Sequence, residues 1–398
     1  MKNTKQIKEI VESLCLSEDF QNTPLRLLIE HFLNEFMKVE RDRFLENQVD
    51  NKANGYYPRT LSDGCNKYNI MVPRDRKGLF RPSILPQSYQ RTTDSYTSLM
   101  EAILFSGYSP SMLKRTIRRL HLPYSESEAQ EIISEVKERL QDFKTRELPN
   151  ETFALCIDAY HTEVKENNRV KQATVYTVMS ISAQGYRDIF GFYVFFGSES
   201  TQHWCKVLED LYKRGLRKVA LFVSDDFSGL DKAIRRFFPD ADHQLCFVHL
   251  MRNIKKHVKK EAVKDILEEL DAIKREKVYE DAVERLKSLC DTYKSHAPVF
   301  FSRLKRRAEL YVTFVKYPKE IRKHIYTTNA VESLNSLLEK IRIRLGGYFQ
   351  SVEILECNLY LQISQLKETK WKNGIPTLKA HQYLLRQAMS IKFATGEE

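Results

Sequence analysis

The sequence lacks the features that mark secreted, fibrous and membrane proteins. Its seven cysteines are odd in number and include no C-x-x-C pair, which argues against a disulfide framework or a four-cysteine zinc site. No apolar run approaches the roughly 18–20 residues that cross a bilayer, and the N-terminus has no apolar signal-peptide segment. We therefore expect a protein without a membrane partner, cytoplasmic in location and associated with the nucleoid if its source is prokaryotic.

Positive charge is the clearest feature that is present. Lys and Arg number 64 against 53 Asp and Glu, a net charge of +11. Over residues 251–350 there are 23 Lys and Arg against 14 Asp and Glu, so much of the excess lies there. A basic excess favours a polyanionic partner, most often nucleic acid, although many basic proteins bind none.

The first 150 residues divide into two regions by composition. Residues 1–48 have helical apolar spacing and predict an N-terminal helical segment. Residues 49–150 form a second region. Its first part, to residue 92, is rich in Gly, Pro and Arg with interspersed tyrosines and predicts either an extended arm along a DNA backbone, with Arg74 and Arg76 as contacts, or a solvated linker.

A helix-turn-helix pattern follows at residues 94–122. Ser109 and Pro110 fit the N-cap and first turn of its second helix. That helix carries four cations that could contact DNA, Lys114, Arg115, Arg118 and Arg119. An ordinary helical hairpin is the alternative. A charged helix at 124–146 comes next, and Pro149 and Asn150 indicate a domain boundary.

From residue 151 the pattern predicts an α/β fold with an RNase H-like catalytic core. Three strands, 153–164, 173–182 and 187–196, predict an antiparallel meander. A helix at 201–214, a buried strand at 218–223, a helix at 229–238 and a strand at 244–249 complete the order βββαβαβ. We expect residues 151–250 to form the first part of the core, 251–322 an all-helical insertion, and 323–398 a catalytic helix and C-terminal helices that complete the core.

Three carboxylates are the candidate catalytic and metal-binding groups. Asp158 and Asp225 each end an apolar strand segment, where an ionised carboxylate is costly unless it is paired or binds a metal. Glu332 comes from the last long helix, which begins near Asn329, and shares a polar face with Asn335. The alternative is that the two Asp residues are turn formers or helix caps, and that Asn329 and Glu332 form an N-x-x-E capping box.

Oxygen donors of this kind suit Mg²⁺ or Mn²⁺. Two ions about 4 Å apart would activate an attacking water or DNA 3′-hydroxyl and stabilise the leaving oxygen at phosphorus. The sequence therefore predicts two Mg²⁺ (or Mn²⁺) ions as cofactors of a phosphoryl-transfer enzyme.

Cys246 and His249 form a C-x-x-H pair that we place on the fifth strand. Two soft ligands without a partner pair do not favour a zinc site. A buried structural pair beside the active site is the simpler interpretation, and His249 could also contact a substrate phosphate. Beyond it lies a basic helix face that is either a phosphate-binding surface or a solvated one, formed by Arg252, Asn253, Lys255, Lys256, Lys259 and Lys260.

Several blocks of sequence together resemble the Mutator-type insertion-sequence transposases. They run in order from about residue 50 to about 385. They are Asn54-Gly55-Tyr56-Tyr57, Val72 to Arg76 with Gly78 and Phe80, Tyr89-Gln90-Arg91, Ser106-Gly107, Asp158-Ala159-Tyr160, Ser200 to Trp204 with Leu208, Leu211 and Arg214-Gly215, Asp225 with Gly229, Ala233-Ile234 and Phe238-Pro239, Gln244 to Cys246, His249, Arg252-Asn253, and Thr327 to Asn335.

The resemblance implies a DDE transposase that binds the terminal inverted repeats of its element and joins a freed 3′-hydroxyl to target DNA. The family's acidic residues fall on Asp158, Asp225 and Glu332, and its C-x-x-H signature on Cys246 and His249. One departure is Asp226, which stands where the family usually has Gly and could substitute for Asp225. The expected partners are double-stranded DNA, both element ends and target, and further copies of the chain in a homodimer or larger assembly. The alternatives are another RNase H-like nuclease, such as a resolvase, and a domesticated DNA-binding protein without catalysis.

Overall fold

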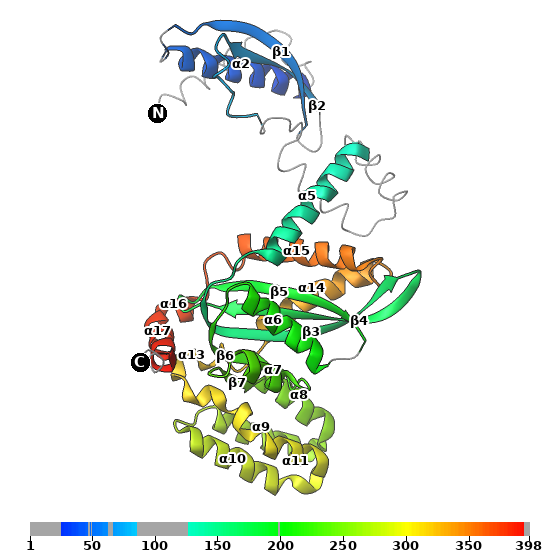
Figure 1. The fold of residues 1–398 in the computed structure, drawn as a ribbon, viewed down its shortest axis with the longest axis vertical. Coiled ribbons are helices and arrows are strands. Elements are labelled where there is room, and N and C mark those ends of the chain that lie inside the picture. Colours follow the sequence, from blue (N-terminus) through cyan, green and yellow to red (C-terminus); the bar gives the residue numbers. More distant parts are fainter. Residues whose placement is uncertain are drawn as a thin grey trace. The chain divides into compact units, whose positions relative to one another are not determined.

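The computed structural model describes residues 25–46, 48, 50–62, 67–85, 126–197 and 200–393. The chain forms two compact units, Met1–Val136 and Lys137–Glu398, which divide within helix α5 (Glu126–Thr145). Both are drawn in Figure 1. The helix-turn-helix prediction at 94–122 lies outside the described residues. Within them, no helix is both long and apolar enough to cross a membrane.

The first unit is built from helix α2 (Leu25–Glu46) and an antiparallel hairpin of β1 (Ala53–Ser62) and β2 (Lys67–Asp75). Alternate residues of β2, including Ile70 and Val72, are buried against Leu33 and Met37 of α2. On the exposed edge of β2, Glu30 accepts a hydrogen bond from the Asn69 N–H at 2.7 Å. The solvated-linker alternative is therefore wrong for β2, because its side chains Tyr68, Ile70 and Val72 belong to a core.

The second unit contains a five-stranded mixed sheet in the order β5-β4-β3-β6-β7. The long strands β3 (Glu151–Glu166), β4 (Arg169–Ile181) and β5 (Arg187–Phe196) form the expected antiparallel meander. The strands β6 (Lys218–Ser224) and β7 (Asp242–Leu245) are parallel to β3. Helix α6 (Thr201–Lys213) connects β5 to β6 and helix α7 (Leu230–Phe237) connects β6 to β7, as the sequence predicts.

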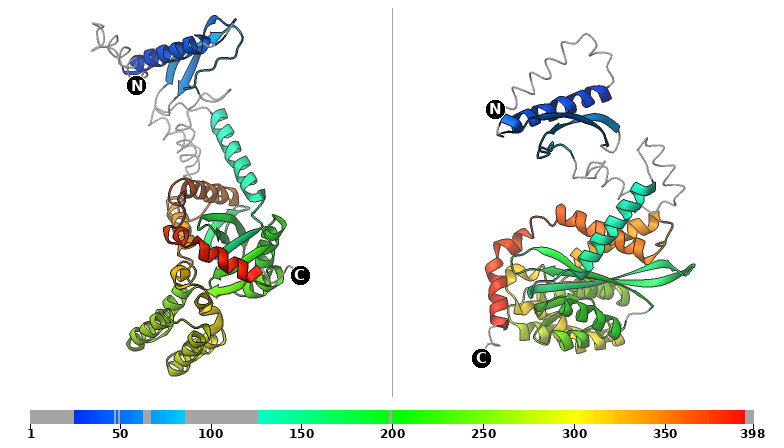
Figure 2. Two further views of the ribbon diagram at one scale, coloured as in Figure 1. Left: turned by 90° about the vertical axis from the view of Figure 1, so that its left-hand side faces the viewer. Right: turned by 45° about the horizontal axis from the view of Figure 1, so that its top comes forward.

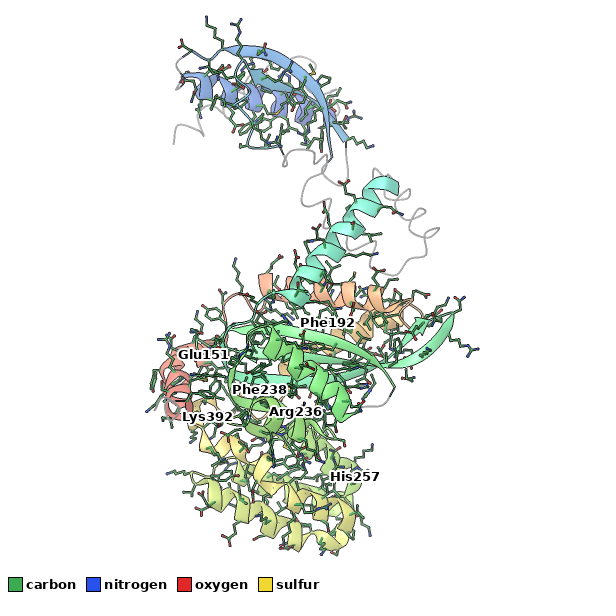
Figure 3. All side chains as sticks on the ribbon, viewed as in Figure 1. Glu151, Phe192, Arg236, Phe238, His257 and Lys392 are labelled. Carbon is green, nitrogen blue, oxygen red and sulfur yellow. The ribbon has the colours of Figure 1, made fainter. Side chains whose placement is uncertain are left out.

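A large apolar cluster joins α6 and α7 to one face of the sheet. Trp204, Leu208 and Leu211 of α6 pack with Leu155 of β3 and Phe222 of β6, and all are fully buried. Helices α14 (Asn329–Arg344), α15 (Val352–Glu368) and α17 (Gln382–Phe393) also contact the sheet strands, and the two further views in Figure 2 show them with the sheet. Aromatic packing extends to α5, where Phe143 stacks on Phe192, labelled in Figure 3, with ring centroids 5.7 Å apart.

Every secondary-structure element between β7 and α14 is an α-helix or a 3-10 helix. These are α8 (Phe247–His257), α9 (Lys260–Ile273), α10 (Tyr279–Thr292), η2 (Lys294–His296), α11 (Pro298–Arg306), α12 (Ala308–Tyr311), η3 (Thr313–Lys316) and α13 (Lys319–Arg322). Helix α16 (Pro376–Ala380) lies between α15 and α17.

The expected strand at 244–249 is wrong in its second half. Strand β7 ends at Leu245, Cys246 is the N-cap of α8, and His249 lies in the first turn of that helix. The backbone N–H of Cys246 donates to the Ser224 carbonyl at 2.7 Å and that of Phe247 donates to the Tyr326 carbonyl at 2.8 Å. These bonds turn the chain out of the sheet, and a short buried apolar run fits a strand or a helix equally well.

Candidate active site

Asp158 and Asp225 meet because of the register between two parallel strands. The last residue pair of β3 and β6 is Ile157 with Ser224, so the next residue of each strand is an aspartate at the same edge. Asp158 ends the apolar segment of its strand but not the strand itself, since β3 continues to Glu166. What ends at Asp158 is the pairing with β6, and this leaves room for two carboxylates.

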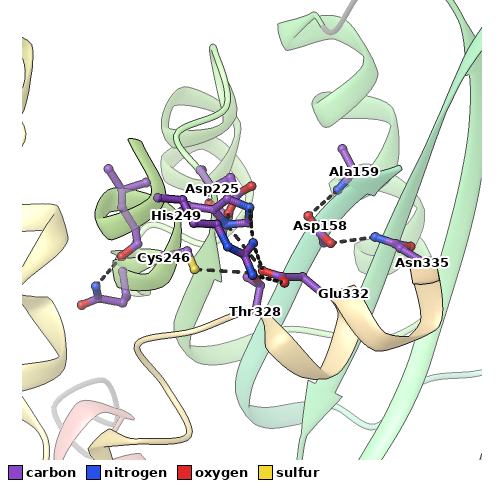
Figure 4. A network of polar contacts seen from close by, with 12 residues as sticks. Asp158, Ala159, Asp225, Cys246, His249, Thr328, Glu332 and Asn335 are labelled. Carbon is purple, nitrogen blue, oxygen red and sulfur yellow. Dashed lines mark hydrogen bonds and ion pairs between the residues drawn. The ribbon is translucent and has the colours of Figure 1, made fainter. Parts of the chain in front are cut away.

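Asp158 is held in a defined position and is only 5% exposed. Its Oδ1 accepts a hydrogen bond from the Ala159 N–H at 3.0 Å, and its Oδ2 accepts one from the Asn335 amide at 2.6 Å. Asn335 comes from α14, 177 residues further along the chain. Two fixed donors therefore orient this carboxylate, as Figure 4 shows.

Glu332 lies in the first turn of α14 and faces the same place. Its carboxylate receives two hydrogen bonds from the Arg252 guanidinium, at 3.0 and 2.8 Å, and its Oε1 is 3.7 Å from His249 Nδ1. The N-cap residue of α14 is Thr328, and its side chain makes no capping hydrogen bond. The Glu332 side chain therefore binds cationic groups of α8 instead of serving the helix end as a capping box.

Asp158 is affected electrostatically by its burial and by the two other acidic groups. Burial raises the pKa of Asp158 to about 7, and the nearby charges of Asp225 and Glu332 add to the shift. Burial is the larger cause of this shift, and the two neighbouring acids act in the same direction. Because Asp158 has no cationic partner within salt-bridge distance among the described residues, the cluster favours binding of an additional cation.

His249 and Arg252, one turn apart on α8, contact Asp225 and Glu332. Burial lowers the pKa of His249, but its contacts with Asp225 and Cys246 outweigh burial and raise the pKa to about 10. His249 Nδ1 is 2.5 Å from Asp225 Oδ1. Arg252 is exposed over 54% of its side chain. The pair supplies positive charge to Asp225 and Glu332, but neither residue forms a salt bridge with Asp158.

Asp226, the neighbour that could substitute for Asp225, points elsewhere. Its Oδ2 is 2.6 Å from Arg303 and its Oδ1 is 3.0 Å from Arg307. Both cations belong to the end of α11 and the residue after it. The geometry therefore assigns Asp225 to the carboxylate cluster and Asp226 to an ion-pair contact with the helical segment.

A pocket of about 360 Å³ opens beside Asp225. His249, Asn253 and His257 of α8 line it together with Phe300 and Arg303 of α11. The pocket thus lies between Asp225 and Asp226 on one side and the helices that follow β7 on the other, and neither Asp158 nor Glu332 lines it. Its wall combines aromatic and cationic groups beside Asp225.

The predicted DNA-binding residues fall in three places. Lys255, Lys256 and Lys259 are exposed on α8 and just after it, close in sequence to Arg252. Arg74 and Arg76 are exposed at the end of β2, and the Arg74 guanidinium lies 5.8 Å from the ring centroid of Tyr57. The remaining four, Lys114, Arg115, Arg118 and Arg119, lie outside the described residues.

Gln244 is a positioning residue that the sequence prediction did not assign. It is fully buried on β7, where its amide donates to the Tyr311 carbonyl at 2.8 Å and accepts from the Phe314 N–H at 2.7 Å. These bonds fix the end of the helical segment to the sheet next to the site. The available signal was an amide side chain within a buried apolar strand, which must find partners.

The fold and the site together define an α/β protein with a carboxylate-rich candidate metal centre at the end of a mixed sheet. The chain belongs to the Mutator family of transposases, whose family model matches residues 1–374. The resemblance inferred from the sequence is thereby confirmed.

Several curated relatives are similar over most of their length. The transposase for insertion sequence element ISRM5 of Rhizobium meliloti is 30% identical over 87% of this chain and 92% of its own. The probable transposase for an ISRM3-like element of Sinorhizobium fredii is 28% identical over 90% and 88%. That for IS1201 of Lactobacillus helveticus is 27% identical over 89% and 97%. The Drosophila P element transposase strand transfer complex is 11% identical over 76% of this chain and 87% of that one, with a TM-score of 0.26.

Proposed function

We propose that this transposase binds the terminal inverted repeats of an insertion element, cuts a DNA strand at the element end and joins the freed 3′-hydroxyl to target DNA. The observation that carries the proposal is the meeting of Asp158, Asp225 and Glu332 at one edge of the sheet. Family membership and the relatives, which are named as transposases for insertion sequences, support the same activity.

The residues fit a pair of divalent cations. Oriented carboxylates provide hard oxygen ligands, and a bound cation would offset both the burial and the neighbouring acidic charge that raise the pKa of Asp158. Asp158, Asp225 and Glu332 would hold the ions, with Mg²⁺ or Mn²⁺ as the suited metals. When bound, two such ions would activate the attacking oxygen and stabilise the leaving oxygen of an in-line displacement at phosphorus.

The chain's own groups complete the site. Asn335 and the Ala159 N–H keep the Asp158 carboxylate aimed at the cluster. Arg252 neutralises Glu332. Because the Arg252 side chain is 54% exposed, it could also contact a DNA phosphate. Gln244 holds the helical segment between β7 and α14 in place beside the site where the DNA strand would react.

The element order βββαβαβ and the sheet order β5-β4-β3-β6-β7 support an RNase H-like core. In this assignment residues 251–322 are an insertion and α14 returns to the core with Glu332. The exposed lysines of α8 would contact the DNA backbone. Residues 49–150 would hold the element end, and a dimer or larger assembly would bring two ends together.

The test is a cleavage and strand-transfer assay with purified protein, Mg²⁺ and a labelled duplex that carries the element's terminal repeat. Products mapped at nucleotide resolution should show a nick at the repeat boundary and joined target strands. Preference for branched DNA over the repeat would instead identify a resolvase. Repeat binding without metal-dependent cleavage would identify a DNA-binding protein that has lost catalysis.

A further inference from the structure

A second set of donor atoms, different in chemistry from the three carboxylates, lies beside them. One ligand atom each of Asp225, Cys246 and His249 falls within 4.8 Å of the others. The set combines a carboxylate oxygen, a thiol sulfur and an imidazole nitrogen. A mixed set of this kind suits softer transition metals such as Zn²⁺, whereas Mg²⁺ prefers oxygen alone.

The three donors are fixed by backbone structure. Cys246 caps α8 and His249 lies three residues later, so both side chains share one face of the helix. The Cys246 N–H donates to the Ser224 carbonyl at 2.7 Å, which ties the start of α8 to the residue before Asp225. The Thr328 hydroxyl lies 3.5 Å from Cys246 Sγ and holds the thiol from the side of α14. Cys246 itself is 1% exposed.

The contact between Asp225 and His249 also fits a shared ligand position. Asp225 Oδ1 and His249 Nδ1 are 2.5 Å apart and form an ion pair beside the Cys246 thiol. A cation bound here would replace the imidazole proton and would gain a carboxylate oxygen, a nitrogen and a sulfur as ligands.

We propose that Asp225, Cys246 and His249 form a binding site for one thiophilic divalent cation of the Zn²⁺ class. Three protein ligands leave a fourth tetrahedral position for water or another donor. The sequence shows only the two soft ligands on α8, and the fold adds Asp225 from β6. The site goes beyond the proposed DNA chemistry, because its sulfur and nitrogen donors are not those that hold Mg²⁺.

Asp225 belongs to both donor sets, so a cation bound by Cys246 and His249 would compete with Mg²⁺ for this carboxylate. A carboxylate engaged by a cation on the cysteine side directs one oxygen away from Asp158. A thiophilic ion should therefore lower cleavage measured in Mg²⁺, and a chelator specific for such ions should restore it.

The test uses Co²⁺ as a spectroscopic probe of the reduced, metal-free full chain without DNA. Wild-type protein should bind one Co²⁺ in this site and show a thiolate-to-cobalt charge-transfer absorption that Zn²⁺ abolishes by displacement. C246S should lose that absorption, and C246S and H249A should each bind at least about tenfold more weakly, since even outer-shell changes cost that much. C205S, which removes a cysteine of α6, is the matched control and should match wild type.

H249C separates ligand loss from misfolding, because a second thiolate should keep Co²⁺ bound and intensify the absorption. An absent band in wild type, or an unchanged band in C246S, would overturn the proposal. The outcome is independent of the DNA chemistry: E332Q should lose cleavage and keep the cobalt band. Cleavage without a band would refute this site alone, and a band without cleavage would refute the proposed function alone.

Discussion

Two acidic sites, the single carboxylate Asp242 and the cluster that contains Asp225, stand at opposite ends of the parallel strands β6 and β7. Asp242 is the first residue of β7 and pairs with Leu221, whereas Asp225 follows the last residue of β6. Asp242 accepts a hydrogen bond from the Tyr317 hydroxyl at 2.9 Å and pairs with Lys316 at 3.3 Å. Lys392 of α17, labelled in Figure 3, binds it too. Asp158, in contrast, faces two more carboxylates.

The difference appears in the direction of the pKa shifts. Burial acts to raise the pKa of Asp242, but the bonds from Lys392 and Tyr317 and the charge of Lys316 lower it overall. At Asp158 burial and the neighbouring acids act together and raise the pKa to about 7. A carboxylate surrounded by cations stabilises the fold, whereas one surrounded by carboxylates costs stability and indicates a place for an external cation.

The largest expected effect is on catalysis. E332Q and D158N should each reduce strand cleavage at least about a thousandfold, because each removes a charged ligand from a preorganised site. Gel-shift binding to the repeat duplex should stay within about threefold of wild type. D242N is the matched control, and its folded fraction should cleave normally. Wild-type cleavage rates in both E332Q and D158N would place the chemistry elsewhere.

The second effect is on stability at Asp242. D242N leaves Lys392 and Lys316 without their acid and should lower the free energy of unfolding by roughly 1–3 kcal/mol at neutral pH. Since folding lowers the pKa of Asp242 from 3.8, its contribution is fully present above pH 4 and is lost as the pH falls through the folded-state value. Denaturant titrations of both proteins from pH 7 to pH 3 should therefore converge.

D158N should have the opposite effect in metal-free protein. Folding raises the pKa of Asp158 from 3.8 to about 7, so the folded state binds the proton more tightly. The wild-type free energy of unfolding should fall as the pH rises from about 4 to about 7. The amide avoids this cost, and D158N should be more stable by roughly 1–3 kcal/mol at pH 8. Equal thermal midpoints at pH 8 would contradict the proposed repulsion.

The smallest effect concerns the two adjacent aspartates. D226N should keep cleavage within about threefold of wild type and lose at most about 1 kcal/mol of stability, the usual value of a partly exposed ion pair. D225N should be as inactive as E332Q. Cleavage rates of D225N and D226N therefore test which of the two side chains belongs to the carboxylate cluster. An inactive D226N together with an active D225N would assign Asp226 to the cluster in place of Asp225.

The strands of the sheet and the helices packed on it could be predicted from the sequence, because their apolar periodicity is long and regular. The sequence also placed Asp158, Asp225 and Glu332 in one hypothesis, although their metal role is still a proposal. Two features were not readable. Cys246 to His249 is a short apolar run, and only the backbone bonds to Ser224 and Tyr326 decide that it is helical.

Long-range pairs were the second feature. Arg252 lies 80 residues before Glu332 and Arg303 lies 77 residues after Asp226. Nothing in the local sequence selects one arginine from the many on the basic helices. Their partners depend on how the helical segment docks on the sheet, which Gln244 and its two backbone bonds help to fix.

The most direct measurement is Mn²⁺ binding, monitored through the electron paramagnetic resonance signal of free Mn²⁺. It compares the wild-type protein with D158N, D225N and E332Q, and D226N and D242N are the controls. If the three carboxylates share the cations, each of the first three substitutions weakens or removes Mn²⁺ binding, while both controls bind as wild type does. Unchanged Mn²⁺ binding in D158N and E332Q would show that these side chains do not hold the metal.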